Sequence, residues 1–411
     1  QAAPQFGPSS QCEGRLRAAR TERLVREGRL ELSPSAECRE IAMRIAVLSV
    51  AGEALAEVEA EGCWTLRELE VASPALAVGR GGRRYLHGEA IVSPATSLEE
   101  AGLADGSHLT LVRLSQVLVA SASSDGTAKV WDSESGECLL TVGGGVQDMF
   151  SVAFSPDGCM LATASKDGTV SLWTARLGEL LRTLQCASPV KSVAFSPSGH
   201  MLIGVSGNDA FLWQVASGEL LRTLAVGDTG VDAAAFSPNG SWFAAAHDLE
   251  GSLWSTVSWE CVHVLRRPEC RGTGMCAVAF SPDSAQLVVS CFGLVRLWDV
   301  SSGALVRQLH VEGYVWSVAF SPDGMRLLLA RSNGTALMIS TDSWETLQTL
   351  TCAAFPRHDD VVSVSFSPDG SRVAAAARYS ASVWDVQGCE ARFLRMLEGH
   401  TEDVNEVVFC P

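Results

Sequence analysis

The chain has very little lysine. Its only lysines are Lys129, Lys166 and Lys191, and the formal net charge of the 411 residues is −16. Proteins that bind nucleic acid neutralise phosphates with clustered Lys and Arg side chains. The charge balance therefore argues against a general nucleic-acid-binding function.

The cysteines show no metal-binding arrangement. Thirteen are scattered along the chain, but no two form a CxxC pair and none lies near a histidine pair at zinc-ligand spacing. We therefore expect no metal, no other cofactor and no disulfide framework. An odd number of scattered thiols is typical of a reducing compartment, which predicts an intracellular protein. We expect it in the cytoplasm rather than in the nucleus.

Long apolar runs are also missing. Although 47% of the residues are hydrophobic, no uninterrupted apolar run approaches the roughly 18 to 20 residues that a membrane-spanning helix needs. With 19% charged residues, the composition predicts a soluble globular protein, and the length allows two or three domains.

A short motif repeats through most of the chain. A Phe-Ser-Pro element recurs about every 40 to 46 residues, a period typical of propeller blades. A seventh, imperfect copy is Phe409-Cys410-Pro411. The six complete copies begin at Phe154, Phe195, Phe236, Phe280, Phe320 and Phe366.

Each period contains signals for four short strands. In one unit we expect strands at residues 151–154 and 160–165, a third ending at Trp173, and a fourth at residues 180–184. Between the first two, Ser155-Pro156-Asp157-Gly158 supplies the fixed and positive φ values of a tight turn. Four strands per unit predict one antiparallel blade.

These units resemble the WD-repeat family over residues 115–411. Third strands of that family end in tryptophan, and here only the sixth unit differs, with Ile339 at this place. The tryptophans are Trp131, Trp173, Trp213, Trp254, Trp298 and Trp384. The resemblance implies an all-β, seven-bladed WD-repeat propeller.

The first unit lacks its first strand, and the last segment is a first strand with no blade after it. We therefore predict that the C-terminal segment 399–411 pairs with Val117–Ser121, which leaves no open sheet edge in the ring. The alternative is that further repeats have been lost. The resemblance implies a hydrogen-bonded structural tetrad across this seam, formed by His400, Ser121, Asp125 and Trp131.

A serine, a histidine and an aspartate close together could indicate a hydrolase. Ser121, however, would lie inside a strand, out of reach of a substrate. We therefore predict no catalytic residues and no enzymatic activity.

Residues 43–114 resemble the ubiquitin-like fold. Met43–Val47 matches its first strand, Leu55–Glu59 the returning strand, Thr65–Val71 the helix and His108–Leu114 the final strand. The resemblance implies a small α+β (β-grasp) domain. Residues 1–42 are expected to be a poorly ordered extension or a short helix.

The resemblance also implies an apolar recognition patch on this domain, at Val50, Tyr85 and Val112. These side chains could instead pack against the propeller or be scattered on the surface. Because no diglycine follows Leu114, the domain cannot be a processed, conjugated modifier.

WD-repeat propellers usually bind partners on the face that carries the turns before each first strand and after each second strand. Strand alternation places positions four and six residues before each conserved Phe towards this rim. The predicted partner-binding residues are Asp148, Phe150, Lys191, Asp232, Tyr314, Trp316, Asp360 and Asp403. In the alternative, Trp316 turns into the core beside Val315 and Val318.

Aromatic side chains ringed by carboxylates suit a basic segment of another protein. We therefore expect a non-catalytic protein-interaction scaffold, with proteins as partners and no role for nucleic acid or membrane. The alternative is an adaptor in ubiquitin signalling, whose ubiquitin-like domain recruits the machinery and whose propeller selects the substrate. One feature argues against an adaptor that docks onto cullin ligases. Propellers of that kind often carry arginine three residues after the blade tryptophan, and these positions are here Glu134, Ser301 and Gln387.

Overall fold

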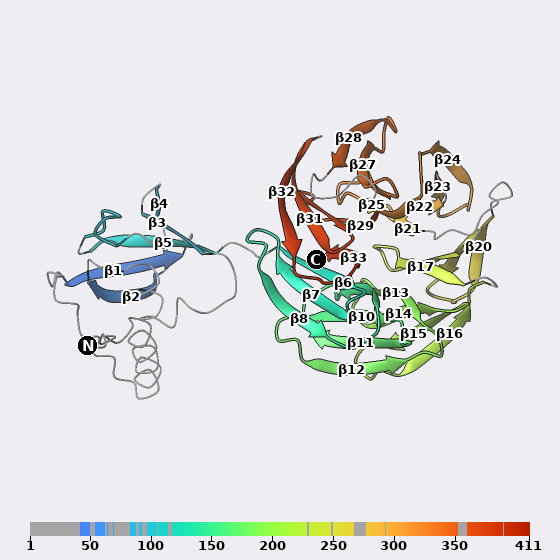
Figure 1. Ribbon diagram of the computed structural model, residues 1–411, viewed down its shortest axis with the longest axis horizontal. Coiled ribbons are helices and arrows are strands. Elements are labelled where there is room, and N and C mark those ends of the chain that lie inside the picture. Colours follow the sequence, from blue (N-terminus) through green and yellow to red (C-terminus); the bar gives the residue numbers. More distant parts are fainter. Residues whose placement is uncertain are drawn as a thin grey trace, which may run out of the picture. The chain divides into compact units, whose positions relative to one another are not determined.

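The structure is a computed structural model of the chain, and it divides into two compact units, Gln1–Ser115 and Gln116–Pro411 (Figure 1). Each unit is described by itself. The described residues are 42–49, 54–61, 64, 69, 83–87, 90–92, 97–104, 106–113, 117–227, 230–247, 250–266, 277–291, 293–351, 360–388 and 390–411.

The N-terminal unit contains one five-stranded sheet in the order β2-β1-β5-β3-β4. Its strands are β1 (Ala42–Ser49), β2 (Ala54–Glu61), β3 (Arg83–His87), β4 (Ala90–Val92) and β5 (His108–Arg113). β1 and β5 run parallel at the centre of the sheet, and the other neighbours are antiparallel. Ile45, Val47 and Leu109 from these strands pack with Leu69 and Leu98 in a buried core.

Several features expected in this unit lie outside the described residues. They are residues 1–41, Val50 and, except for Leu69, the expected helix Thr65–Val71. Tyr85 and Val112 belong to β3 and β5, but their side chains are also outside the described part. The strands are the only elements here with described bounds.

The second unit is a ring of seven four-stranded antiparallel sheets, numbered here as blades 1 to 7 (Figure 1). Strands are given from the innermost to the outermost. Blade 1 is β33 (Val404–Phe409), β6 (Leu118–Ser123), β7 (Thr127–Asp132) and β8 (Cys138–Gly143). Blade 2 is β9 (Met149–Phe154), β10 (Met160–Ser165), β11 (Thr169–Thr174) and β12 (Leu180–Gln185). Blade 3 is β13 (Val190–Phe195), β14 (Met201–Ser206), β15 (Asp209–Gln214) and β16 (Leu220–Ala225).

The remaining blades repeat this arrangement. Blade 4 is β17 (Val231–Phe236), β18 (Trp242–His247), β19 (Glu250–Ser255) and β20 (Cys261–Arg266). Blade 5 is β21 (Ala277–Phe280), β22 (Gln286–Cys291), β23 (Leu294–Asp299) and β24 (Leu305–His310). Blade 6 is β25 (Val315–Phe320), β26 (Arg326–Arg331), β27 (Thr335–Ser340) and β28 (Thr346–Thr351). Blade 7 is β29 (Val361–Phe366), β30 (Arg372–Ala377), β31 (Ser380–Gln387) and β32 (Glu390–Glu398). The seven-bladed propeller predicted from the repeat is confirmed.

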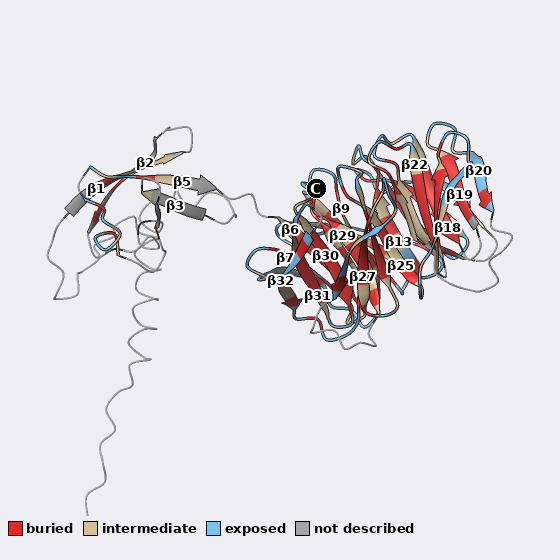
Figure 2. Cartoon of the chain, turned by 90° about the horizontal axis from the view of Figure 1, so that it is seen from above, coloured by how far each residue is buried: buried red, intermediate tan, exposed pale blue. Residues whose placement is uncertain are grey.

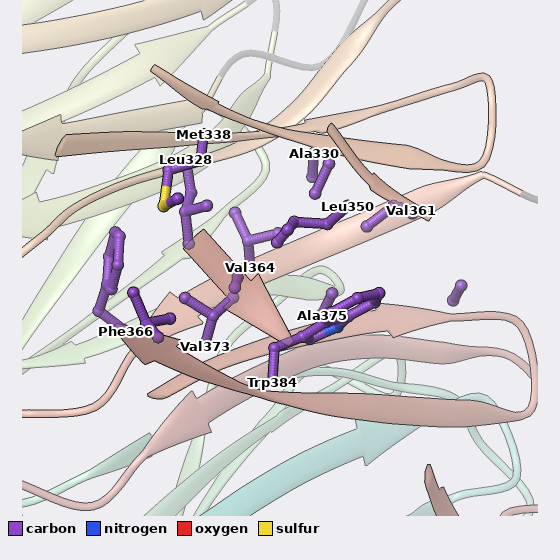
Figure 3. Packing of buried hydrophobic residues seen from close by; sticks show 14 residues of the cluster. Leu328, Ala330, Met338, Leu350, Val361, Val364, Phe366, Val373, Ala375 and Trp384 are labelled. Atoms are coloured by element: carbon purple, nitrogen blue, oxygen red, sulfur yellow. The ribbon is translucent and has the colours of Figure 1, made fainter. Parts of the chain in front are cut away.

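The core of the ring lies between neighbouring blades. In Figure 3, Leu328 and Met338 of blade 6 pack against Val364, Phe366 and Trp384 of blade 7. The second strands are buried almost throughout, whereas the outermost strands are exposed at most positions (Figure 2). Blades that converge on a central axis leave least room near it, and small side chains fit this taper. The second strands β18 and β30 are rich in alanine.

Candidate partner-binding face and ring seam

The ring is closed by strands from opposite ends of the propeller sequence. β33 pairs antiparallel with β6, with Val404 opposite Ser123 and Phe409 opposite Val119, as the repeat pattern predicts. In Figure 1 the C-terminal strand lies beside β6. Blade 1 therefore depends on contacts between residues more than 270 positions apart.

The four residues expected at this seam are joined by hydrogen bonds. The Trp131 indole Nε1 donates to Ser121 Oγ at 2.8 Å, and Ser121 Oγ lies 2.8 Å from His400 Nε2. On the other side of the imidazole, His400 Nδ1 lies 2.8 Å from Asp125 Oδ2. Nδ1 beside a carboxylate carries the proton, so Nε2 accepts from the serine hydroxyl. Ser121 is only 1% exposed, which keeps its hydroxyl away from any substrate.

The charges of this tetrad are set by its burial. Burial lowers the pKa of His400 more than its hydrogen bond with Asp125 raises it. Burial alone would raise the pKa of Asp125, but hydrogen bonds from Thr127, His400 and Thr401 lower it to about 2. At neutral pH a neutral imidazole is therefore held by an ionised carboxylate.

The other blades keep only parts of the tetrad. In blade 2, Trp173 Nε1 donates to Thr163 Oγ1 at 3.0 Å. In blades 4 and 7 a serine two residues before the tryptophan accepts this bond, with distances of 2.9 Å for Trp254–Ser252 and 3.1 Å for Trp384–Ser382. These serines lie on the third strand, whereas the acceptors in blades 1 and 2, Ser121 and Thr163, lie on the second strand.

The closing strand also binds blade 2. Asn405 Nδ2 donates to the Met149 carbonyl at 2.7 Å, and the Val152 N–H donates to Glu406 Oε2 at 2.7 Å. At the position of Glu406, the inner strands of the other blades carry Ser or Ala. For example, Ser151 Oγ accepts the Val193 N–H at 3.1 Å. Burial raises the pKa of Glu406 to about 7.

The inner strands surround a central channel with a cavity of about 490 Å³. Five of the eight predicted partner-binding residues line it, namely Phe150, Lys191, Asp232, Trp316 and Asp360. Asp148, Tyr314 and Asp403 lie immediately before inner strands, at the mouth of the channel. Glu406 lines the same cavity and was missed from the sequence.

Blade 6 contributes an aromatic pair to this mouth. The rings of Tyr314 and Trp316 stack with centroids 5.4 Å apart and an interplanar angle of 11°. Trp316 Nε1 donates to Asp360 Oδ2 at 3.1 Å. Val315 and Val318 are buried in the core between blades, whereas Trp316 faces the channel. The indole is therefore held in place by a stacked ring and a carboxylate.

The predicted carboxylates differ in their surroundings. Lys166 Nζ lies 3.1 Å from Asp148 Oδ2, and Lys191 Nζ lies 2.5 Å from Asp232 Oδ1. Two of the three lysines therefore neutralise carboxylates on this face. Asp360, just before blade 7, lies next to the aromatic pair of blade 6 and accepts the Trp316 N–H, whereas Asp403 lies just before the closing strand of blade 1.

An exposed aromatic side chain, Tyr379, lies in the turn between β30 and β31. Tyr379 is 49% exposed, and the Arg378 guanidinium lies 5.3 Å from its ring centroid. Arg378 has a φ of 42°, a left-handed conformation that a residue with a long side chain seldom adopts. The Arg378 carbonyl accepts the Val404 N–H, which ties this turn to the closing strand. The sequence signal for Tyr379 was an Arg-Tyr pair where blade 2 has Asp167-Gly168.

A larger cavity, of about 710 Å³, lies between blades 2 and 3 and contains none of the predicted partner-binding residues. Met160, Leu172, Leu181 and Val215 supply its apolar lining. The channel face carries half-buried aromatic side chains and charged groups of the kind that recognition needs, so we place the candidate site there.

No helix in the described part of the chain is long and apolar enough to cross a membrane. No group of three or more His, Cys, Asp or Glu side chains in it is placed to hold a metal ion.

Comparison with known proteins identifies the family. A family model described as the IFT122 first beta-propeller matches residues 113–354, and the WD domain, G-beta repeat model matches residues 346–385. The WD repeat-containing protein VIP3 of Arabidopsis thaliana is 30% identical over 154 residues, covering 34% of this chain and 46% of that protein.

Two further relatives match shorter stretches. The small ribosomal subunit protein RACK1 of Caenorhabditis elegans is 28% identical over 123 residues, which cover 29% of this chain and 36% of that protein. The F-box-like/WD repeat-containing protein TBL1X of Mus musculus is 48% identical over 44 residues, which cover 11% of this chain and 8% of that protein. The chain thus spans less than half the length of each of these relatives.

The relatives are WD-repeat proteins, which supports binding to other proteins as the general role of the propeller. Because one family model matches more than half of its residues, this chain belongs to the WD-repeat β-propellers, in the family described as the IFT122 first β-propeller.

Proposed function

We propose that this protein is a non-catalytic interaction scaffold that binds a basic segment of another protein on its channel face. One observation carries the proposal. The stacked pair Tyr314–Trp316 borders the channel beside Asp360, which accepts the Trp316 indole N–H, and these three residues form its aromatic and acidic sector.

The chemistry of this sector suits a segment with an apolar side chain next to Lys or Arg. Large aromatic side chains at the centre of an interface supply most of the binding energy, and charges on the rim guide the encounter. Trp316 is already oriented by Tyr314 and Asp360, so little side-chain entropy is lost when a partner binds. The opposite wall of the channel carries the Lys191–Asp232 ion pair. Because its two charges balance, that wall attracts a cation less strongly than the wall with Asp360.

The test compares two faces of the same blade. The full chain carrying Tyr314→Ala and Trp316→Ala is used in affinity capture from cells, followed by mass spectrometry. The control is Met325→Ala, because Met325 is 69% exposed and lies in the turn between β25 and β26, at the opposite end of blade 6. We expect the double variant to lose partners that the control retains. An unchanged set of partners in a double variant with wild-type thermal stability would overturn the proposal.

We also propose that residues 43–114 form a ubiquitin-like domain. The strand order β2-β1-β5-β3-β4, with a parallel central pair, supports it.

An adaptor role in ubiquitin signalling would depend on this domain and has no support from the relatives. Enrichment of ligase or proteasome subunits by proximity labelling would favour it. An intracellular, cytoplasmic location is part of the same proposal and can be tested by cell fractionation.

A further inference from the structure

Neighbouring blades contact one another through the turns that join their first and second strands. The glycine of one turn faces the proline of the preceding blade. A β-carbon added at Gly199 would lie 3.6 Å from Pro156 Cδ, and one added at Gly324 would lie 3.7 Å from Pro282 Cδ. These contacts recur around the ring.

The contact differs at the seam between blades 1 and 2. A β-carbon added at Gly158 would lie 2.9 Å from the sulfur of Cys410, so a thiol fills the place that proline has elsewhere. Cys410 follows the closing strand, and its N–H donates to the Leu118 carbonyl at 2.9 Å. The next residue after Gly158 is Cys159. Two cysteines distant in sequence therefore stand on adjacent turns.

Both thiols are free, with Cys159 exposed and Cys410 half-buried. Burial raises the pKa of the Cys410 thiol to about 11, and the nearby Cys159 and Asp157 also raise it. The Cα atom of Cys159 is about 3.8 Å from that of its neighbour Gly158. A disulfide between Cys159 and Cys410 needs their own Cα atoms to lie about 4.4 to 6.8 Å apart. With Gly158 in contact with the Cys410 sulfur, rotation of the Cys159 side chain and a small movement of its turn can bring the two sulfurs together.

We propose that Cys159 and Cys410 form a reversible disulfide that locks the closing strand of the propeller to blade 2. The oxidant is a small-molecule disulfide of the glutathione class. The Cys159 thiolate attacks one sulfur of the oxidant, whose S–S bond breaks and releases one glutathione thiolate. The Cys410 sulfur then attacks the Cys159 sulfur, the mixed S–S bond breaks, and the second glutathione leaves with the Cys410 proton. Two protein thiols are oxidised, and one glutathione disulfide is reduced to two glutathiones.

The bond would act on the one blade that is assembled from both ends of the propeller sequence. β33 is held to β6 by strand pairing and the tetrad, and the disulfide would add a covalent link to the next blade. Closing a loop of about 250 residues restricts the unfolded chain strongly. We therefore expect the melting temperature to rise by roughly 5 °C or more on oxidation.

The experiment uses the full chain equilibrated with oxidised glutathione. Peptide mapping without reduction should find residues 159 and 410 in one cross-linked product, whose mass is two hydrogens below the sum of the two free peptides. Both the cross-link and the rise in melting temperature should disappear in C159S and in C410S. They should remain in C138S and C261S, which remove exposed thiols of the outer strands.

Three results would overturn the inference. They are glutathione bound to Cys159 without the cross-link, a cross-link of Cys410 to another cysteine, and a cross-link that leaves the melting temperature unchanged. Because the readouts are mass and stability, they do not depend on whether the channel face binds a partner.

Discussion

Replacing Glu406 with glutamine should remove a pH dependence from the stability of the propeller. Burial of the carboxyl group in the channel wall raises its pKa from 4.5 to about 7, despite the hydrogen bonds from Ser151 and from the Val152 N–H. Between these two values the folded protein retains a proton that the unfolded chain has released. The free energy of unfolding therefore falls as pH rises from about 4.5 to about 7, and stays low above that.

The size of this effect follows from the two pKa values. Each pH unit between them is worth about 1.4 kcal/mol, so ionisation of Glu406 costs the folded protein about 3 kcal/mol by about pH 8. The E406Q variant keeps an oxygen that can accept the Val152 N–H and carries no charge. It should therefore be about 3 kcal/mol more stable than the wild type at about pH 8, and of similar stability below about pH 4.5.

Urea unfolding followed by circular dichroism at both pH values tests this reasoning. The matched control is Glu402→Gln, because Glu402 is exposed in the turn just before the closing strand and should have little effect. An E406Q variant with the same loss of stability between the two pH values as the wild type would refute the role assigned to the buried carboxyl group. A fall in stability at both values would show that the Val152 hydrogen bond needs the carboxylate.

Two further predictions concern the seam. The folded state holds the pKa of Asp125 at about 2, below its usual 3.8, so about 2 kcal/mol of stability is present above pH 4 and lost as pH falls towards 2. Asp125→Asn should flatten acid unfolding followed by circular dichroism, and an unaltered profile would contradict this. Deleting residues 398–411 removes β33 and His400, so the melting temperature measured by calorimetry should fall sharply. An unchanged melting temperature would show that this strand does not hold the ring together.

Much of the propeller could be predicted from the chain because its signals are local and repeated. The Phe-Ser-Pro turns and the tryptophans mark each blade within about 45 residues, so the blades can be counted without tertiary information. The missing first strand near Val117 and the unpaired strand before Phe409 together indicate how the ring closes. Unpaired strand edges are unfavourable, which is why this long-range pairing follows from a local pattern.

The charges and contacts of the channel face could not be predicted from the spacing of residues along the chain. Alternation along a strand places Asp148 and Asp232 at the rim, but only the packed blades show that Lys166 and Lys191 neutralise them. Likewise, nothing in the sequence distinguishes Glu406 from the other Asp and Glu residues, which number 47 in all. Only its burial between packed blades raises its pKa. A side chain acquires its charge and its accessible surface from neighbours on other strands, and those neighbours are set by tertiary packing.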